Sequence, residues 1–113
     1  KTLNHEQIEI WGDGSVVRDY IYIEDVCEMI GSLINYNGKE EVFNLSSNQG
    51  ISLNDVIEKM KKFGLKPDVV YKEARSVDVP KVILDNHKIA HIHEFKIRSF
   101  DEGLKLYIDY LRK

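Results

Sequence analysis

The chain has 113 residues and a formal net charge of −3, with 42% hydrophobic and 31% charged residues. This length suits one domain with a single core. The composition excludes collagen-like and strongly disordered classes, and the weak acidic charge without a basic stripe argues against nucleic-acid binding.

Cys27 is the only cysteine, so no internal disulfide can form, and a reducing cytoplasm is the expected location. Its helical setting predicts that Cys27 lies in the core. No apolar run approaches the roughly 20 residues that span a bilayer, so no membrane partner is expected. The chain opens at Lys1 without an initiator methionine, which we interpret as a piece of a longer protein.

The stretch from residue 8 to residue 26 carries the densest local signals. Apolar and polar residues alternate over 8–11, which predicts a strand with one buried face. Gly12, Asp13 and Gly14 then predict a turn, and residues 16–23 predict a second strand that pairs with the first as a hairpin.

A helix of about ten residues is expected next. Asp25 and Glu28 have the spacing of a capping box, and the polar residues 35–38 end the helical pattern. The apolar run 41–45 predicts a short strand, and 46–50 a loop.

Three capping signals define the rest of the chain. Ser52 followed by Asp55 begins a second helix, which Gly64 closes. A strand over 68–71 and a long polar loop over 72–80 follow. Asp85 is expected to cap a short helix holding Ile89 and Ile92.

Ser99 and Glu102 begin the final helix, in which Gly103 indicates close packing. These expectations together give a small α/β (mixed α+β) domain with short strands and about four helices.

Most catalytic and metal-binding patterns are missing. His87, His91 and His93 make a metal site conceivable, but no cysteine or carboxylate pair supports them, so solvated histidines are the preferred interpretation and no metal is expected. The sequence contains no Gly-x-Ser-x-Gly elbow and no Gly-x-Gly-x-x-Gly or Gly-Lys-Ser/Thr phosphate loop. No catalytic residue is therefore predicted.

Two arginines remain as candidate binding residues, each followed by an aspartate. These are Arg18 with Asp19, and Arg75 with Asp78. Arginine donates paired hydrogen bonds to phosphate oxygens, and a carboxylate accepts from ribose hydroxyls, so the pairs fit a nucleotide clamp. Two surface salt bridges explain the same spacing equally well.

The residues also resemble a known family. The pattern Ile-x-Ile-Trp-Gly-Asp-Gly at 8–14 and Arg-Asp-Tyr-Ile-Tyr-Ile-x-Asp-Val at 18–26 is similar to the C-terminal part of the NAD-dependent epimerase/dehydratase family. These enzymes are extended short-chain dehydrogenases that act on nucleotide sugars, with UDP-glucose 4-epimerase as type member. Val-Phe-Asn-Leu-Ser-Ser at 42–47, Arg-x-x-Asp-Val at 75–79 and Phe-x-Glu-Gly-Leu at 100–104 follow in the family's order.

The resemblance implies a role for each candidate residue. Trp11 would lie beside the uracil, Arg18 and Arg75 would hold the diphosphate, and Asp78 would bind the ribose. The sequence departs from the family pattern at Ala74, where glycine is frequent. It departs again at 94–97, where a Gly-aromatic-x-Pro pattern is usual.

The resemblance also implies an incomplete enzyme. The family's NAD-binding glycines and its catalytic Tyr-x-x-x-Lys belong to an N-terminal Rossmann domain, and neither pattern occurs here: Tyr36 is followed four residues later by Glu40, and Tyr71 by Arg75. Residues 1–113 are therefore expected to be the UDP-sugar-binding C-terminal domain of a Rossmann-type enzyme, which uses NAD only when complete. The alternative is a non-catalytic interaction module that self-associates, as a possible homo-oligomer.

Overall fold

The computed structural model describes residues 1–113, which form two compact units. The first unit comprises Lys1–Arg18 and Gly50–Val82, and the second comprises Asp19–Gln49 and Ile83–Lys113. Four α-helices and several short strands make up the regular structure. The predicted mixed α/β fold class is confirmed.

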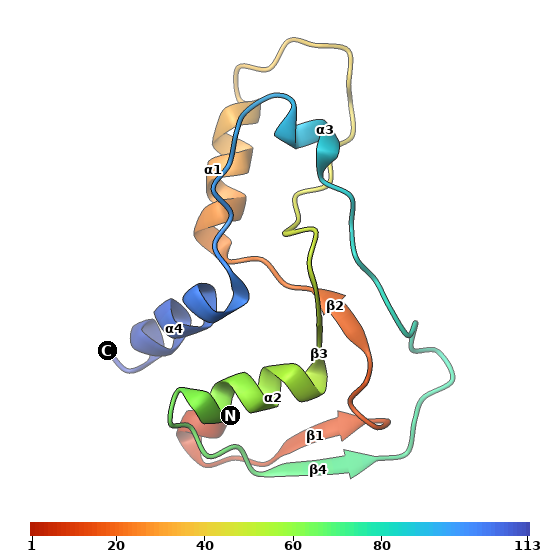
Figure 1. Ribbon diagram of the computed structural model, residues 1–113, viewed down its shortest axis with the longest axis vertical. Coiled ribbons are helices and arrows are strands. Elements are labelled where there is room, and N and C mark those ends of the chain that lie inside the picture. Colours follow the sequence, from red (N-terminus) through yellow and green to blue (C-terminus); the bar gives the residue numbers. More distant parts are fainter. The chain divides into compact units, whose positions relative to one another are not determined.

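The first unit is built on a parallel pair of strands, β1 (Ile8–Trp11) and β4 (Val69–Lys72), preceded by the 3-10 helix η1 (Thr2–Asn4). The two arrows run side by side in Figure 1, with Ile8 opposite Val69 and Trp11 opposite Lys72. In β1 Ile10 is buried while Glu9 and Trp11 are exposed, so the alternation predicted from the sequence is confirmed.

The predicted hairpin is wrong. The turn itself is present, because Gly12 and Gly14 adopt φ angles of 88° and 78°. However, β1 pairs with β4, whereas β2 (Val17–Asp19) pairs with β3 (Gly50–Ser52). A glycine turn indicates a change of chain direction, but the strand partner is selected by longer-range packing.

Helix α2 (Leu53–Lys62) follows β3 directly and begins as predicted. The Ser52 hydroxyl accepts a hydrogen bond from the Asp55 backbone N–H, and the Asp55 carboxylate accepts one in return from the Ser52 backbone. Ile57 is its buried residue. Gly64, at φ 77°, follows the end of the helix, as expected of a left-handed C-terminal residue.

The second unit begins at the end of β2, which is shorter than predicted. Regular strand geometry stops at Asp19, and helix α1 (Ile23–Leu33) begins four residues later, with Tyr22 as its N-cap. The predicted strand over 16–23 is therefore wrong beyond Asp19. The Tyr20 ring instead packs edge-on against Phe100, with centroids 5.5 Å apart.

The capping box predicted at Asp25 and Glu28 is also wrong, because α1 starts two residues before Asp25 and has no side-chain cap. Asp25 is instead buried, with 2% of its surface exposed. Its carboxylate accepts hydrogen bonds from the Arg98 backbone N–H, at 3.0 Å, and from the Arg98 guanidinium.

No regular strand forms over 41–45, contrary to the sequence prediction. Side chains link this region to the chain before α3 instead: Asn44 Nδ2 donates to the Asp85 carbonyl at 3.0 Å, and Ser46 Oγ to the Leu84 carbonyl at 3.1 Å. This region is therefore held by hydrogen bonds from side chains to backbone carbonyls, whereas a strand requires a series of backbone–backbone hydrogen bonds.

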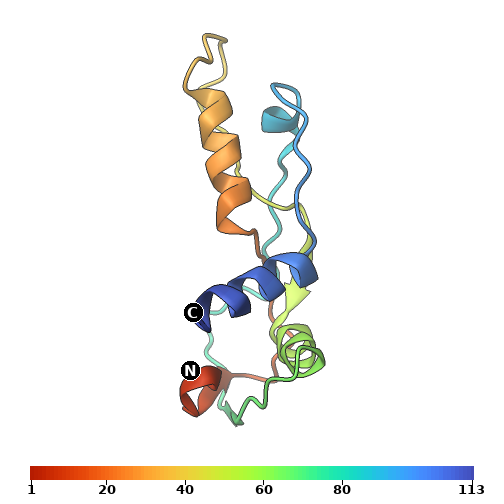
Figure 2. The same ribbon diagram turned by 90° about the vertical axis from the view of Figure 1, so that its left-hand side faces the viewer.

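The remaining helices are α3 (His87–Ala90) and α4 (Phe100–Leu111). The N-cap of α3 is Asn86 and not Asp85, so the predicted cap is wrong, although the Asp85 carboxylate accepts a hydrogen bond from the His87 backbone N–H at 2.9 Å. Ile89 is buried in α3, whereas Ile92 lies beyond the helix. Figure 2 shows α1 in orange and, alongside it, the chain from α3 to α4, which runs in the opposite direction.

Helix α4 has the predicted capping box between Ser99 and Glu102. A Cβ added at Gly103 would lie 3.2 Å from the Tyr22 Cβ, which explains the glycine by close packing.

Cys27 is exposed, so its prediction as a core residue is wrong. It lies on the face of α1 opposite the fully buried Met29, because helical spacing places neighbouring positions on different faces. None of the helices is both long enough and apolar enough to cross a membrane.

Candidate functional site

All four residues predicted to bind a nucleotide line one hollow of about 180 Å³ in the first unit. The lining side chains come from β1, from the segment 16–18 that leads into β2, from the first residue of α2 and from the loop after β4. The lining residues are Glu9, Ile10, Trp11, Val16, Arg18, Leu53, Arg75 and Asp78.

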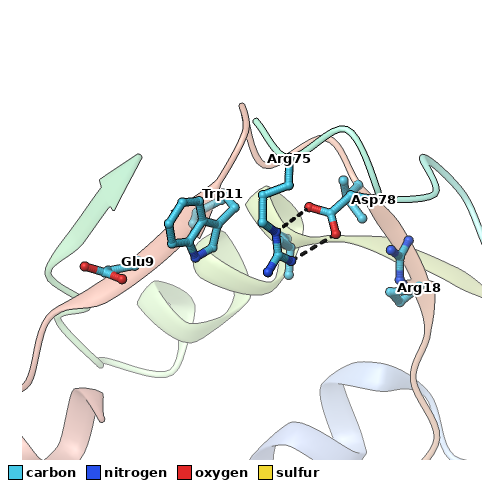
Figure 3. A pocket seen from close by; sticks show the side chains of 8 residues that line it. Glu9, Trp11, Arg18, Arg75 and Asp78 are labelled. Carbon is cyan, nitrogen blue, oxygen red and sulfur yellow. Dashed lines mark hydrogen bonds and ion pairs between the residues drawn. The ribbon is translucent and has the colours of Figure 1, made fainter. Parts of the chain in front are cut away.

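Arg75 is held from two sides. Its Nε and Nη2 donate hydrogen bonds of 3.0 and 2.9 Å to the two oxygens of Asp78, drawn as dashed lines in Figure 3. Its guanidinium carbon also lies 5.5 Å from the centroid of the Trp11 ring, within the range of a cation–π contact. The loop after β4 thus brings one cation and one carboxylate to the indole.

The aromatic surface at the site is open to solvent. Trp11 is 42% exposed at the end of β1, and it shares its face of the strand with Glu9. An accessible indole offers a flat stacking surface for a nucleobase, which is sequence-tolerant because every base has a π face.

Arg18 has no carboxylate partner in the described chain. Its Nη1 donates to the carbonyls of Val17 and Val79, both at 2.8 Å. These bonds fix the side chain between β2 and the loop after β4, while leaving the charge uncompensated and other guanidinium N–H groups free. A cation held in this way is suited to an anionic ligand.

Four residues that line the hollow were not predicted from the sequence: Glu9, Ile10, Val16 and Leu53. Glu9 shares a face with Trp11 through the period-2 alternation, which was the signal that could have identified it. Its carboxylate pairs with Lys72 Nζ at 3.4 Å. In Figure 3 the Glu9 carboxylate points away from Arg75 and Asp78.

The turn between β1 and β2 is stabilised by its own side chains. The Asp13 carboxylate accepts hydrogen bonds from the Ser15 hydroxyl and from the Ser15 backbone N–H, at 2.5 and 2.9 Å. These two bonds favour the charged form and so lower the pKa of Asp13 below its ordinary value. The turn that joins Trp11 to Arg18 is therefore braced by two hydrogen bonds between Asp13 and Ser15.

The histidines do not come together as metal ligands. No group of three His, Cys, Asp or Glu side chains in residues 1–113 is arranged to hold a metal ion. His87 instead contacts Asp85 through its backbone N–H and its ring, and these hydrogen bonds lower the pKa of Asp85.

Comparison with known proteins points to one family. Residues 1–46 match the model of the NAD dependent epimerase/dehydratase family. A putative UDP-glucose 4-epimerase of Methanocaldococcus jannaschii is 26% identical over 113 residues, covering 99% of this chain and 36% of its own length.

Solved structures show the same relationship. The UDP-glucose 4-epimerase of Thermotoga maritima, solved with UDP-glucose, is 38% identical with a TM-score of 0.86, and the match covers 98% of this chain and 36% of that one. The family-model match, the curated relative and the solved structure all support a relationship of this chain to the NAD-dependent epimerase/dehydratase family.

NAD is the cofactor of this epimerase/dehydratase family. The UDP-glucose 4-epimerase of Thermus thermophilus, solved with NAD, is 26% identical with a TM-score of 0.82, and the match covers 98% of this chain and 37% of that one. The fold of this chain is thus found in Rossmann-type extended short-chain dehydrogenases. The chain spans little more than a third of the length of these three relatives.

Proposed function

We propose that residues 1–113 are the C-terminal substrate-binding domain of an NAD-dependent nucleotide-sugar epimerase or dehydratase, and that this domain anchors UDP. The observation that carries the proposal is Arg18, an uncompensated cation in a hollow that also holds Trp11, Arg75 and Asp78. The relatives support it, because the epimerase of Thermotoga maritima was solved with UDP-glucose.

Each of the four side chains has a role suited to its chemistry. The Trp11 indole provides an apolar surface beside the uracil ring, and Arg18 and Arg75 donate hydrogen bonds to the diphosphate oxygens. Asp78 accepts hydrogen bonds from the ribose hydroxyls. The negative diphosphate would compete with Asp78 for the Arg75 guanidinium, so ligand binding requires the Arg75–Asp78 pair to rearrange.

The residues of this chain do not fit NAD itself. A dinucleotide-binding turn leads from a strand into a helix N-terminus, whereas the Gly12–Gly14 turn leads from β1 into β2. The chain also lacks the family's Tyr-x-x-x-Lys. In the proposed enzyme, NAD binding and the chemical step therefore belong to an N-terminal Rossmann domain outside residues 1–113.

The contribution of this domain to catalysis is then orientation. Contacts with the uridine and the diphosphate are remote from the reacting carbon of the sugar, and their binding energy fixes the sugar in one position relative to the cofactor. Loss of these contacts is expected to reduce turnover as well as affinity.

The test is a calorimetric titration of the complete gene product with UDP, UMP and uridine. We expect affinity to fall in that order, with the largest step between UDP and UMP, because UMP lacks the second phosphate. Equal affinities for UDP and UMP would contradict a diphosphate clamp, and no binding of UDP would reject the proposed function.

Exposed apolar side chains favour a second candidate, a non-catalytic module that self-associates. Ile23 and Ile30 of α1 and its C-cap residue Ile34 are 64%, 50% and 77% exposed, at spacings that share one helical face. Light scattering over a range of protein concentrations distinguishes the candidates. A monomer that binds UDP would reject this second candidate.

A further inference from the structure

We propose that Asn54 is a positioning residue for the hollow: its carboxamide ties the turn between Trp11 and Arg18 to strand β4. The consequence for ligand binding rests on the proposed function, but the consequence for the geometry of the turn does not.

The carboxamide uses both of its ends. Asn54 Nδ2 donates to the Asp13 carbonyl at 2.9 Å, and Asn54 Oδ1 accepts from the Tyr71 hydroxyl at 2.9 Å. Asp13 belongs to the turn after β1, Asn54 to α2 and Tyr71 to β4. A side chain of this length needs a donor and an acceptor to make both bonds, which a carboxamide provides and a carboxylate does not.

The first turn of α2 reinforces this link through its backbone. Helix N-termini leave their first N–H groups without partners inside the helix. Here the Leu53 N–H donates to the Val16 carbonyl at 3.2 Å, and the Asn54 N–H donates to the Gly14 carbonyl at 3.0 Å. The start of α2 therefore binds the turn at two backbone positions and one side-chain position.

Gly14 shows how closely Asn54 covers the turn. Gly14 is buried, at a φ of 78°, and a Cβ added there would lie 2.1 Å from Asn54 Oδ1. A side chain at position 14 would thus displace the carboxamide. The glycine allows the left-handed conformation and also leaves space for Asn54.

The turn matters because of what lies at its two ends. Trp11 precedes Gly12 at the end of β1, and Arg18 lies in β2, and both line the hollow. A turn that shifts changes the separation between the indole and the Arg18 guanidinium. A ligand that contacts both groups is sensitive to that separation, whereas a ligand that contacts only the arginines is not.

The test compares Asn54→Leu, which has a similar size but no polar side-chain atoms, with Tyr71→Phe, which removes one hydroxyl. Glu58→Gln is the control, because Glu58 is exposed on the same helix and its carboxylate pairs with Lys61 Nζ at 2.7 Å, away from the turn. Affinities for UDP and for inorganic pyrophosphate are measured in the complete gene product, together with the thermal unfolding midpoint.

For Asn54→Leu we expect about tenfold weaker UDP binding, which is the scale of about one hydrogen bond. Pyrophosphate binding should weaken less than about twofold. Tyr71→Phe should weaken UDP binding by a smaller factor, and Asn54→Gln should restore part of the loss. Unchanged UDP affinity, or an equal fold-loss for both ligands, would overturn the positioning role.

A measurement without ligand separates this inference from the proposed function. Trp11 is the only tryptophan in the 113 residues, and a Trp11→Phe spectrum identifies its indole N–H resonance in a ¹⁵N-labelled protein. Asn54→Leu should shift or broaden that resonance, and Glu58→Gln should not. An unchanged resonance would reject the inference even if UDP binds, and a shifted one would sustain it even if UDP does not.

Discussion

Arg75 and Asp78 form a bidentate ion pair, with both carboxylate oxygens of Asp78 accepting hydrogen bonds from one guanidinium. The pair lies on a hollow whose other cation, Arg18, is bonded only to backbone carbonyls. The hollow therefore contains one arginine whose charge is compensated by a neighbour and one whose charge is available.

Removing the Asp78 charge is expected to affect two ligands differently. In Asp78→Asn the carboxylate no longer competes for Arg75, and a half-exposed ion pair contributes at most about 1 kcal/mol, so inorganic pyrophosphate should bind up to about fivefold more tightly. UDP should not gain, because the ribose loses its charged acceptor. Equal gains for both ligands, measured by calorimetry, would argue against a ribose contact.

The buried carboxylate of Asp25 predicts a large effect on stability. Arg98→Ala leaves Asp25, with its side chain only 3% exposed, without its guanidinium partner. We expect the thermal unfolding midpoint to fall by at least about 5 °C, the shift typical of a substantial loss in a domain of this size. Arg112→Ala removes an exposed arginine of the same unit and is the control. Equal midpoints for the two variants would show that the pair does not stabilise the fold.

Two helical glycines offer a matched comparison. Nothing lies within 4 Å of a Cβ added at Gly31 in α1, whereas one added at Gly103 in α4 lies 3.2 Å from Tyr22. Gly31→Ala should therefore stabilise the protein by about 0.5–1 kcal/mol through helix propensity. Gly103→Ala should gain less, and Gly103→Val should destabilise. Chemical denaturation measures all three, and an equal gain at both alanine sites would contradict the close packing at Tyr22.

The capping carboxylates predict how stability depends on pH. Hydrogen bonds from the Ser52 side chain and backbone lower the pKa of Asp55, and those from Ser99 lower the pKa of Glu102. A carboxyl group whose pKa is lowered by folding contributes stability above its unfolded pKa and loses it as pH falls through the folded value. The unfolding midpoint should fall as the solution is acidified below about pH 4 to 5, the unfolded carboxyl range.

The variants Asp55→Asn and Glu102→Gln test this dependence. Combining them should lower the midpoint at neutral pH and make the fall on acidification shallower than in the wild-type protein. An identical acid profile for wild type and double variant would mean that the two caps do not couple folding to protonation.

Local signals in the sequence identified the elements that local interactions define. The caps at Ser52 and Ser99 lie within three residues of their partners, so the starts of α2 and α4 are correctly predicted. The alternation over 8–11 likewise identifies β1 and its buried Ile10.

Long-range pairing was not predictable from the same patterns. Asp25 has the spacing of a capping residue, but its partner Arg98 is 73 residues away and draws it into the interior. The partner of β1 is β4, across most of the first unit, which a turn at Gly12 does not indicate.

The candidate site shows the same division. Spacing alone left Arg18 and Arg75 as either a clamp or two surface salt bridges, and the structure pairs only Arg75 with a carboxylate. Asn54 carried no recognisable signal, because its proposed role depends on the turn at Asp13 and on strand β4, which meet Asn54 only in the fold.

The nucleotide clamp is tested most directly by the affinity of UDP for Arg18→Ala in the complete gene product, measured by calorimetry beside wild type. Lys66→Ala, which removes an exposed cation of the same unit, is the control for net charge. Because Arg18 would donate charge-assisted hydrogen bonds to the diphosphate, we predict a loss of roughly 1.5–3 kcal/mol, or about 10- to 150-fold in Kd, for Arg18→Ala alone. Equal UDP affinities for wild type and Arg18→Ala would contradict the nucleotide clamp.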